Sequence, residues 1–293
     1  MNTVLLRCLL IVLLIGVVVW GIGFSSAFEK ILRPAGTAKN LTVTFLDVGQ
    51  GDAIFIETAF GRQVMIDGGP DSTVLRELSA VMSPWDRTID MVIGTHPDKD
   101  HIGGVVEVLA RYRVTTLLTT ENKGDTTVAT AYQEALLSET NGAIWYARAG
   151  QIIDVGDGVT LAVFSPADNP AMLETNTSSV VLQLRYGDIE FMLTGDAPQG
   201  IEDYLVKTYG SELLESEVLK LGHHGSETST SDLFLKAVTP RFAVASVGKD
   251  NSYGHPKPAV VARAIATGAK VLSTAELGRI TFETDGVAVW VVE

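Results

Sequence analysis

Short apolar runs alternate with amphipathic stretches along the first half of the chain. β-Branched and aromatic residues separated by glycine-containing turns predict three consecutive strands, LTVTFLD (41–47), AIFIET (53–58) and RQVMID (62–67). The next stretch, DSTVLRELSAVM (71–82), has the apolar spacing of a helix. The pattern then predicts a strand at 89–95, a helix at 103–112, a strand at 114–120 and a helix near 127–138.

The second half of the chain repeats this order of strands followed by helices. Strands are predicted at 151–155, 159–165, 178–187 and 189–195, and later at 217–221, 241–248 and 270–274. Helices are predicted near 199–208, 229–237 and 257–267, and a final hairpin turns at Asp285-Gly286. Each half therefore supplies strands and then helices, which predicts an α/β (α+β) fold with two sheets packed face to face and helices outside.

The start of the chain differs from this pattern. Residues 8–24, CLLIVLLIGVVVWGIGF, carry no charge and lie at the short limit for a membrane span. An uncleaved membrane anchor and a secretory signal with a small-residue site at Ser25-Ser26-Ala27 both fit this segment. We therefore expect an anchor or signal in residues 1–33 and a hydrolase-sized domain in 40–293. That domain would lie outside the cytoplasm, held at the cell membrane by a single span, or be secreted.

Composition narrows the function. A net charge of −13 with 46% hydrophobic residues excludes a disordered acidic tail and a basic nucleic-acid scaffold. Without residues 1–33 the chain keeps 19 basic and 34 acidic residues, a net charge of −15, so a polyanion would need local help to bind. The single cysteine, Cys8, lies in the apolar run, so a metal site in the domain must use nitrogen and oxygen ligands.

Polar residues with metal-binding chemistry gather where predicted strands end. The segments are DVGQGD (47–52), THPDKDH (95–101), LTGDA (193–197), LKLGHHGS (219–226) and NSYGHP (251–256), and three of them hold all five histidines. In THPDKDH, His96 with Asp98 could serve one metal, and Asp100 with His101 a second. Imidazole and carboxylate suit zinc, manganese or iron, and the extra carboxylate favours manganese. A solvated turn with one N-capping aspartate before a helix starting near Ile102 would leave the other three residues unexplained.

The motif His96-x-Asp98-x-Asp100-His101 followed by two glycines resembles the histidine-rich signature of the metallo-β-lactamase superfamily, with Asp98 in place of its second histidine. Together with DVGQGD, MIDGG, LTGDA, LKLGHHGS and NSYGHP in this order, it is similar to the extracellular hydrolase domain of ComEC-type competence proteins, over residues 41–256. Phosphorylcholine esterases of the same superfamily are also similar. The resemblance implies a four-layer αββα sandwich with two divalent metal ions, Zn or Mn, at one edge between the sheets. Because the chain has one apolar segment, we expect a stand-alone hydrolase domain.

The resemblance also implies roles for single residues. His96 and Asp98 match ligands of the first metal, Asp100 and His101 match ligands of the second, and Asp196 matches the bridging carboxylate. His223 and His224 match the late histidine motif, and we favour His224 as the ligand. The usual middle histidine has no counterpart between residues 102 and 222, and Asn176 and Ser179 stand where it is expected. The first site would then be weak, be completed by water, or be filled through Asp52 or His223, and a mononuclear enzyme stays open.

Other residues at the strand ends are candidates for supporting the metals or binding substrate. Asp67 would orient the metal-binding loop or sit in a plain turn, and Asp52 would point into the site or into a tight turn. Lys220 would neutralise a phosphate or be solvated. Loops expected at the same edge carry Ser226, Asn251, Tyr253 and His255. Of these, His255 would donate a proton or a hydrogen bond to the substrate, or serve only in packing or capping. We expect catalysis to depend on Asp100, Asp196 and His255.

Two metals would lower the pKa of a bound water to about 7 and need no protein nucleophile. The sequence has no GxSxG motif. We therefore expect an extracytoplasmic, metal-dependent phosphodiesterase, specifically a DNA nuclease linked to DNA uptake. The alternatives are a phosphodiesterase acting on a cell-surface phosphodiester such as phosphorylcholine, and a non-catalytic subunit that binds DNA or a protein partner. The oligomeric state stays open.

Overall fold

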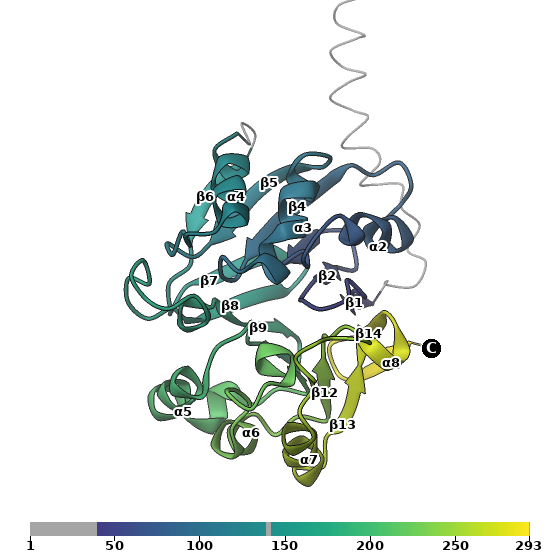
Figure 1. Cartoon of the computed structure of the whole chain (residues 1–293). Coiled ribbons are helices and arrows are strands. Elements are labelled where there is room, and N and C mark those ends of the chain that lie inside the picture. Colours follow the sequence, from purple (N-terminus) through teal and green to yellow (C-terminus); the bar gives the residue numbers. More distant parts are fainter. Residues whose placement is uncertain (1–39, 139–141, 293) are drawn as a thin grey trace, which may run out of the picture. The chain divides into compact units, whose positions relative to one another are not determined.

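Two β-sheets form the centre of the part of the chain that this computed structural model describes, residues 40–138 and 142–292 (Figure 1). Residues 40–293 make up one compact unit. The apolar segment for which we expect an anchor or signal lies outside the described residues. Within the described residues, no helix has the length and apolar character needed to cross a membrane.

The first sheet has eight strands in the order β15-β14-β1-β2-β3-β4-β5-β6. Their bounds are β1 Leu41–Phe45, β2 Ile54–Glu57, β3 Gln63–Ile66, β4 Thr88–Gly94, β5 Arg113–Thr119, β6 Ala143–Tyr146, β14 Ile280–Thr284 and β15 Val289–Val292. Pairing is antiparallel from β15 to β3 and parallel from β3 to β6. Strands β1, β3 and β4 therefore run in the same direction and end at the same edge of the sheet.

The second sheet has seven strands in the order β13-β12-β11-β10-β9-β8-β7. Their bounds are β7 Ile152–Gly156, β8 Val159–Ser165, β9 Val181–Tyr186, β10 Ile189–Leu193, β11 Val218–Lys220, β12 Phe242–Ala245 and β13 Lys270–Ser273. Strands β10 to β13 are parallel to one another, and β7 to β10 pair in antiparallel fashion. The segments that carry the candidate ligands follow β10, β11 and β12 at one edge.

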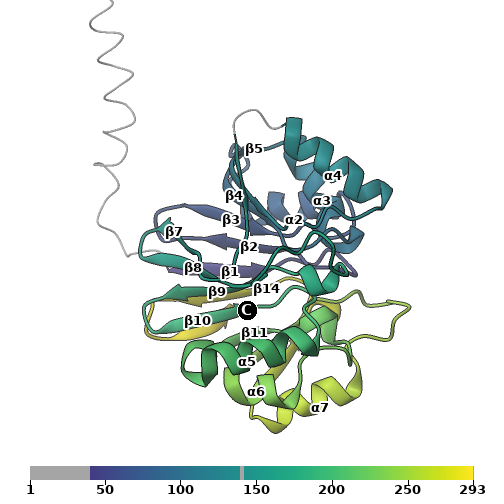
Figure 2. The same cartoon turned by 90° about the vertical axis from the view of Figure 1, so that its left-hand side faces the viewer.

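Apolar side chains fill three layers between these elements. Between the sheets, Phe282 makes edge-on ring contacts with Phe45 and Phe191, each at a centroid distance of 5.9 Å. The outer face of the first sheet is covered by α2 (Thr73–Val81), α3 (Lys99–Leu109) and α4 (Thr127–Ser138). The outer face of the second sheet is covered by α5 (Gln199–Leu214), α6 (Asp232–Val238) and α7 (Pro258–Ala266). Figure 2 shows the two helical layers on opposite sides of the paired sheets, which confirms the predicted αββα sandwich.

Three short helical segments connect these layers: the 3₁₀ turns η1 (Asn176–Ser178) and η2 (Gly222–Gly225), and the helix α8 (Thr274–Leu277). The sequence pattern did not predict β6, whose four residues show no alternation of buried and exposed positions. The predicted start of the helix at 103 was also wrong, because α3 begins at Lys99. Asp100 and His101 therefore lie in the first helical turn and not in a loop.

Close approach of backbone segments holds α3 against the first sheet. A Cβ atom at Gly104 would lie 1.9 Å from the carbonyl oxygen of Gly68, so only glycine fits there. The N–H of Gly104 donates to the carbonyl of Gly69 (2.9 Å), and the N–H of Gly68 donates to the carbonyl of His101 (2.7 Å). This packing places the MIDGG turn directly beside the first turn of α3.

Candidate metal centre

Three buried histidines face one another at the edge where β4, β11 and the start of α3 meet. The rings of His96 and His101 are 4.0 Å apart, and those of His101 and His224 are 5.3 Å apart. Each ring is fixed through Nδ1: His96 to Thr95 Oγ1 (3.1 Å), His101 to Asp67 Oδ2 (2.7 Å) and His224 to the carbonyl of Ser246 (3.0 Å). The three Nε2 atoms are buried and have no hydrogen-bond partner among the described residues. Metal-ligating imidazoles show this same division of roles between the two ring nitrogens.

Three carboxylates lie on the Nε2 side of these rings. Asp196 Oδ2, after β10, lies 3.3 Å from His101 Nε2 and 3.4 Å from His224 Nε2. Asp100 Oδ2 lies 3.2 Å from His224 Nε2, and Asp98 Oδ2 lies 3.6 Å from the Nε2 of His96. The structure thus brings Asp100, His101, His224 and Asp196 together, with His96 and Asp98 as an adjoining pair. Asp98 occupies the N-cap position of α3 but makes no side-chain capping bond, so the helix N-terminus does not take up its carboxylate.

Asp67 orients two of the histidines. Its Oδ1 accepts the N–H of Thr95 (2.8 Å), and its Oδ2 accepts the hydroxyl of Thr95 (2.7 Å) and bonds His101 Nδ1 (2.7 Å). The residue adopts a left-handed backbone conformation with φ 56°, which is uncommon outside glycine. These contacts exclude the plain-turn alternative. Sequence analysis missed Thr95, although its position next to His96 in the motif was a usable signal.

Lys220 and Asp52 form a buried ion pair behind the site. The Lys220 side chain has no exposed surface, so the solvated alternative was wrong. Its Nζ lies 2.6 Å from Asp52 Oδ2 and 3.3 Å from Asp196 Oδ1, and it donates to the carbonyl of Gly195 (2.7 Å). Lys220 is thereby held by two carboxylates and a backbone carbonyl and has no contact with solvent.

Distance alone would group Asp52 with His101, Asp196 and His224 as metal ligands, since one atom of each lies within 4.8 Å of the others. We favour Asp100 over Asp52 for that role. Asp52 approaches the Nδ1 atoms of His224 (3.3 Å) and His101 (3.8 Å), the side opposite to the unpartnered nitrogens. Its charge is already balanced by Lys220.

Charge coupling shifts the acidities of the whole cluster. Burial alone would raise the pKa of Asp196, but His224, His101 and Lys220 outweigh it and hold that pKa well below its usual range. Burial likewise opposes ionisation of Asp100, yet the nearby His224 and His101 rings keep its pKa well below the usual range. Burial would lower the pKa of His224, but Asp196 and Asp52 raise it well above the ordinary value. The carboxylates therefore stay ionised at neutral pH and attract cations.

The two adjacent histidines of LKLGHHGS have different surroundings. Both adopt left-handed backbone conformations, with φ 49° at His223 and 55° at His224, a strained arrangement typical of functional sites. His224 is buried, whereas the side chain of His223 is 29% exposed and its Nε2 lies 3.7 Å from Asp196 Oδ2. The Nδ1 of His223 bonds Thr228 Oγ1 (3.1 Å), which also donates to Ser226 Oγ (3.0 Å). This geometry favours His224 as a ligand and leaves His223 at the rim.

The NSYGHP segment forms a braced loop beside the rim. Asn251 accepts the N–H of His255 (2.9 Å), and its amide donates to the carbonyls of Gly248 and His255 (2.8 Å each). The rings of Tyr253 and His255 stack at 5.8 Å, and the His255 ring lies 6.0 Å from that of His223. Burial and the neighbouring cationic groups lower the pKa of His255 to about 4, so its ring is neutral at pH 7 and better suited to hydrogen bonding than to proton donation.

Asn176 lies on the turn η1, and Ser179 follows this turn as its C-cap and borders the centre. Ser179 Oγ accepts the N–H of Asp196 (3.3 Å), and the hydroxyl of Thr175 donates to Asp98 Oδ2 (3.1 Å). A pocket of about 590 Å³ beside this segment is lined by Thr175, Lys123 and the 95% exposed Met172, among others. None of the candidate metal ligands lines this pocket, which adjoins the centre through Thr175.

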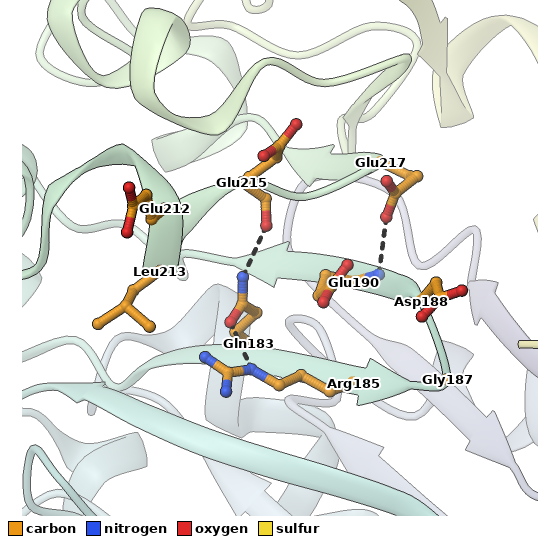
Figure 3. A pocket seen from close by; sticks show the side chains of 9 residues that line it. All are labelled: Gln183, Arg185, Gly187, Asp188, Glu190, Glu212, Leu213, Glu215 and Glu217. Carbon is orange, nitrogen blue, oxygen red and sulfur yellow. Dashed lines mark hydrogen bonds between the residues drawn. The ribbon is translucent and has the colours of Figure 1, made fainter. Parts of the chain in front are cut away.

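A separate acidic pocket of about 340 Å³ lies at the opposite ends of β10 and β11 (Figure 3). Gln183 spans it, donating to the carbonyl of Glu215 (2.9 Å) and accepting from Arg185 (2.7 Å). Glu217 accepts the N–H of Glu190 (2.8 Å) there. Because these groups flank the starts of the strands whose ends carry Asp196 and Lys220, the acidic pocket is not part of the metal centre.

The fold and the histidine–carboxylate cluster together define a metallo-β-lactamase-type hydrolase. The profile of the "Metallo-beta-lactamase superfamily" matches residues 46–249, and the chain belongs to this superfamily.

Curated relatives are competence proteins of the ComEC type, as the motif order indicated. The chain is 29% identical to ComE operon protein 3 of Bacillus subtilis, covering 82% of this chain and 32% of that protein. It is 30% identical to competence protein ComA of Neisseria gonorrhoeae, covering 90% of this chain and 35% of that protein. It is 29% identical to recombination protein 2 of Haemophilus influenzae, covering 86% of this chain and 29% of that protein. The chain thus spans about a third of the length of these relatives.

Solved structures share the fold at low identity. CmlA, a diiron β-hydroxylase from Streptomyces venezuelae, superposes with a TM-score of 0.55 at 12% identity, covering 85% of this chain and 55% of that one. Zn²⁺-bound PqqB from Methylobacterium extorquens superposes with a TM-score of 0.51 at 15% identity, covering 76% of this chain and 85% of that one. These likenesses support the fold alone.

Proposed function

We propose that this protein is a metal-dependent phosphodiesterase that hydrolyses DNA outside the cytoplasm during DNA uptake. The observation that carries the proposal is the set of three buried, unpartnered Nε2 atoms on His96, His101 and His224. Those of His101 and His224 lie within 3.4 Å of Asp196, and that of His96 lies 3.6 Å from Asp98. Unpartnered buried nitrogens are costly, and a bound divalent cation satisfies them.

The charge of the centre matches two such cations. Five carboxylates lie in it, and the one buried ammonium group, on Lys220, offsets one of them. With neutral imidazoles the net charge is −4, which two divalent ions balance. The donors are imidazole nitrogens and carboxylate oxygens, a set that suits zinc or manganese. The carboxylates are those of Asp52, Asp67, Asp98, Asp100 and Asp196.

Divalent cations at such a centre activate water near neutral pH and stabilise negative charge on a phosphoryl group. The chain's own residues hold the geometry for this chemistry. Asp67 and Thr95 fix the imidazoles of His101 and His96 through Nδ1. His223, partly exposed at the rim, and the neutral His255 beside it are placed to hydrogen-bond a substrate bound at the centre.

Features of the braced loop support DNA as the substrate. An acidic domain repels a polyanion, yet the residues that flank this loop are Lys249 and Lys257 with one acidic residue, Asp250. The ammonium of Lys257 donates to the carbonyl of Tyr253 (2.7 Å), and Tyr253 is 62% exposed. An exposed aromatic ring next to a cation suits an unpaired base and its phosphate. The competence-protein relatives support the same substrate and a site of action outside the cytoplasm, at the membrane or after secretion.

The test incubates the purified protein with single- and double-stranded oligonucleotides and Mn²⁺ or Zn²⁺, and follows cleavage together with the bound metal. We expect cleavage by the wild type and by Glu190→Gln, a matched control in the acidic pocket. Asp100→Asn and Asp196→Asn should lose at least about a thousandfold in rate, because both remove charge that holds the metals. Full metal occupancy without cleavage of any DNA would reject the nuclease.

A second candidate is hydrolysis of a cell-surface phosphodiester such as phosphorylcholine. The net charge of −15 without residues 1–33 favours it, since a nuclease usually offers a more basic surface. Turnover of p-nitrophenyl phosphorylcholine without any turnover of DNA would select this function. If neither substrate class is cleaved and Asp100→Asn leaves DNA or partner binding unchanged, the third candidate, a non-catalytic binding subunit, would replace both.

A further inference from the structure

The proposed two-metal function leaves the first metal position short of ligands. The second position can draw on Asp100, His101 and His224, while the first has only His96 and Asp98 besides the shared Asp196. The superfamily's middle histidine has no counterpart in this sequence. Another group of the chain must complete the first position if it is to hold a cation tightly.

The residues on both sides of the turn η1 are fixed against neighbouring segments of the centre. Three hydrogen bonds join them: Thr175 Oγ1 to Asp98 Oδ2 (3.1 Å), Asp196 N to Ser179 Oγ (3.3 Å), and Val180 N to the carbonyl of Thr95 (3.0 Å). The turn is therefore attached to the first ligand pair, to the shared carboxylate and to the residue before His96. Asn176 lies between these attachment points.

The side-chain oxygen of Asn176 is an unsatisfied acceptor. Its Oδ1 is buried and has no hydrogen-bond partner among the described residues, as is also true of His96 Nε2. Leaving a buried amide oxygen unpaired is unfavourable, so such groups in native proteins call for a specific explanation. The oxygen and the nitrogen lie on segments that are joined by hydrogen bonds. A cation bound by both atoms would satisfy them, whereas no protein group of the described residues does so.

We propose that Asn176 Oδ1 is a ligand of the first divalent cation, taking the place of the missing histidine. The first position then offers one imidazole and three oxygen donors: Asn176, Asp98 and Asp196 beside His96. Amide and carboxylate oxygens suit hard cations, whereas an added imidazole would favour zinc. The first position is accordingly selective for Mn²⁺ or Mg²⁺, and the second, with two imidazoles, accepts Zn²⁺ as readily.

The test compares Asn176→Leu, which keeps the volume without the oxygen, with Asn176→Asp, which keeps an oxygen in the same place. Each purified protein is dialysed against Mn²⁺, its bound metal is counted by mass spectrometry, and its spin-coupled Mn²⁺ pair is followed by electron paramagnetic resonance. We expect two equivalents in the wild type and in Asn176→Asp. In Asn176→Leu the coupled signal should disappear and one equivalent should bind at least about tenfold more weakly.

Thr177→Ala serves as the matched control, because Thr177 lies on the same turn and its hydroxyl donates to the Glu174 carboxylate just before the turn (3.2 Å). It should keep both equivalents. The unfolding midpoint of metal-free Asn176→Leu should be no lower than that of the wild type, since the Oδ1 atom has no hydrogen-bond partner among the described residues. Two equivalents bound by Asn176→Leu as tightly as by the wild type would overturn the proposal, as would an equal loss in Thr177→Ala.

This result is separate from the proposed function. If the wild type binds a Mn²⁺ pair that Asn176→Leu loses, yet cleaves no DNA, the ligand assignment stands and the nuclease fails. If DNA is cleaved while Asn176→Leu keeps the coupled pair, the nuclease stands and the ligand assignment fails.

Discussion

Replacing Lys220 by methionine removes the buried ammonium group of the centre while nearly keeping its volume. The Nζ atom lies 2.6 Å from Asp52 Oδ2 and 3.3 Å from Asp196 Oδ1, and both carboxylates are 2% exposed. Breaking a buried ion pair by deleting one partner costs about 3–5 kcal/mol, because the remaining charge stays in a poorly solvated place. We expect Lys220→Met to lower the free energy of unfolding of the metal-free protein by that amount at pH 8.

The loss of unfolding free energy in Lys220→Met should depend on pH in one direction only. Burial favours the neutral form of Asp52, and Lys220 is the largest influence that keeps its pKa below the usual value. In Lys220→Met the pKa of Asp52 rises, so lowering the pH lets this carboxyl group take up a proton and relieves the penalty. The deficit should therefore shrink between pH 8 and pH 5.

Urea unfolding in the presence of EDTA measures both effects, followed by circular dichroism at the two pH values. Lys249→Met, an exposed lysine on the braced loop, is the matched control and should change stability by less than about 0.5 kcal/mol. A loss below about 1 kcal/mol for Lys220→Met at pH 8, or a loss of equal size at pH 5, would refute the assignment of Lys220 as the charge that holds Asp52 and Asp196.

Three further predictions follow from the same structure. In the metal-free protein, neighbouring carboxylates raise the pKa values of His101 and His224 despite the burial of these rings, so both rings are protonated. The stability that this protonation contributes is fully present below pH 6.5 and is lost as the pH rises through the raised pKa values. Metal binding must release those protons, which calorimetry in buffers of different ionisation enthalpy detects; binding at pH 7 without proton release would contradict this. In the acidic pocket, burial and Glu217 raise the pKa of Glu190 to about 7, so the wild type loses stability as pH rises from about 4.5 through 7. Because Glu190 is partly exposed and screened, Glu190→Gln should gain only about 1 kcal/mol at pH 8 and nothing at pH 4, and a gain that is the same at both pH values would contradict it. On the braced loop, Tyr253→Ala should raise KM for a single-stranded oligonucleotide about tenfold while Tyr253→Phe changes it little; equal KM values for the alanine variant and the wild type would remove the stacking role.

The layered fold and the place of the centre could be predicted from the sequence because both depend on local pattern. Strand periodicity and the clustering of His96, His101 and His224 at strand ends are visible in the residues themselves. The start of α3 was placed four residues too late, because the apolar spacing begins after the ligands that occupy its first turn. Strand β6 was missed because its four residues pair at an edge and lack alternation.

The contacts that support the centre could not be predicted, because they join residues far apart in the chain. The pairing of Lys220 with Asp52 bridges the two sheets, and no local pattern indicates that a lysine at the end of β11 is fully buried. The bond from Thr175 to Asp98 likewise connects segments 77 residues apart. Which nitrogen of each histidine faces the metals depends on such contacts, so the sequence indicated the donors but not their orientation.

The central claim is that two divalent cations at this centre support phosphodiester hydrolysis. The most direct measurement titrates Mn²⁺ into the metal-free wild-type protein and records bound metal and the rate of cleavage of a single-stranded oligonucleotide in the same samples. Our account predicts that cleavage rises with occupancy of the second equivalent and is absent from Asp196→Asn. Two bound equivalents without cleavage, or full cleavage by Asp196→Asn, would contradict it.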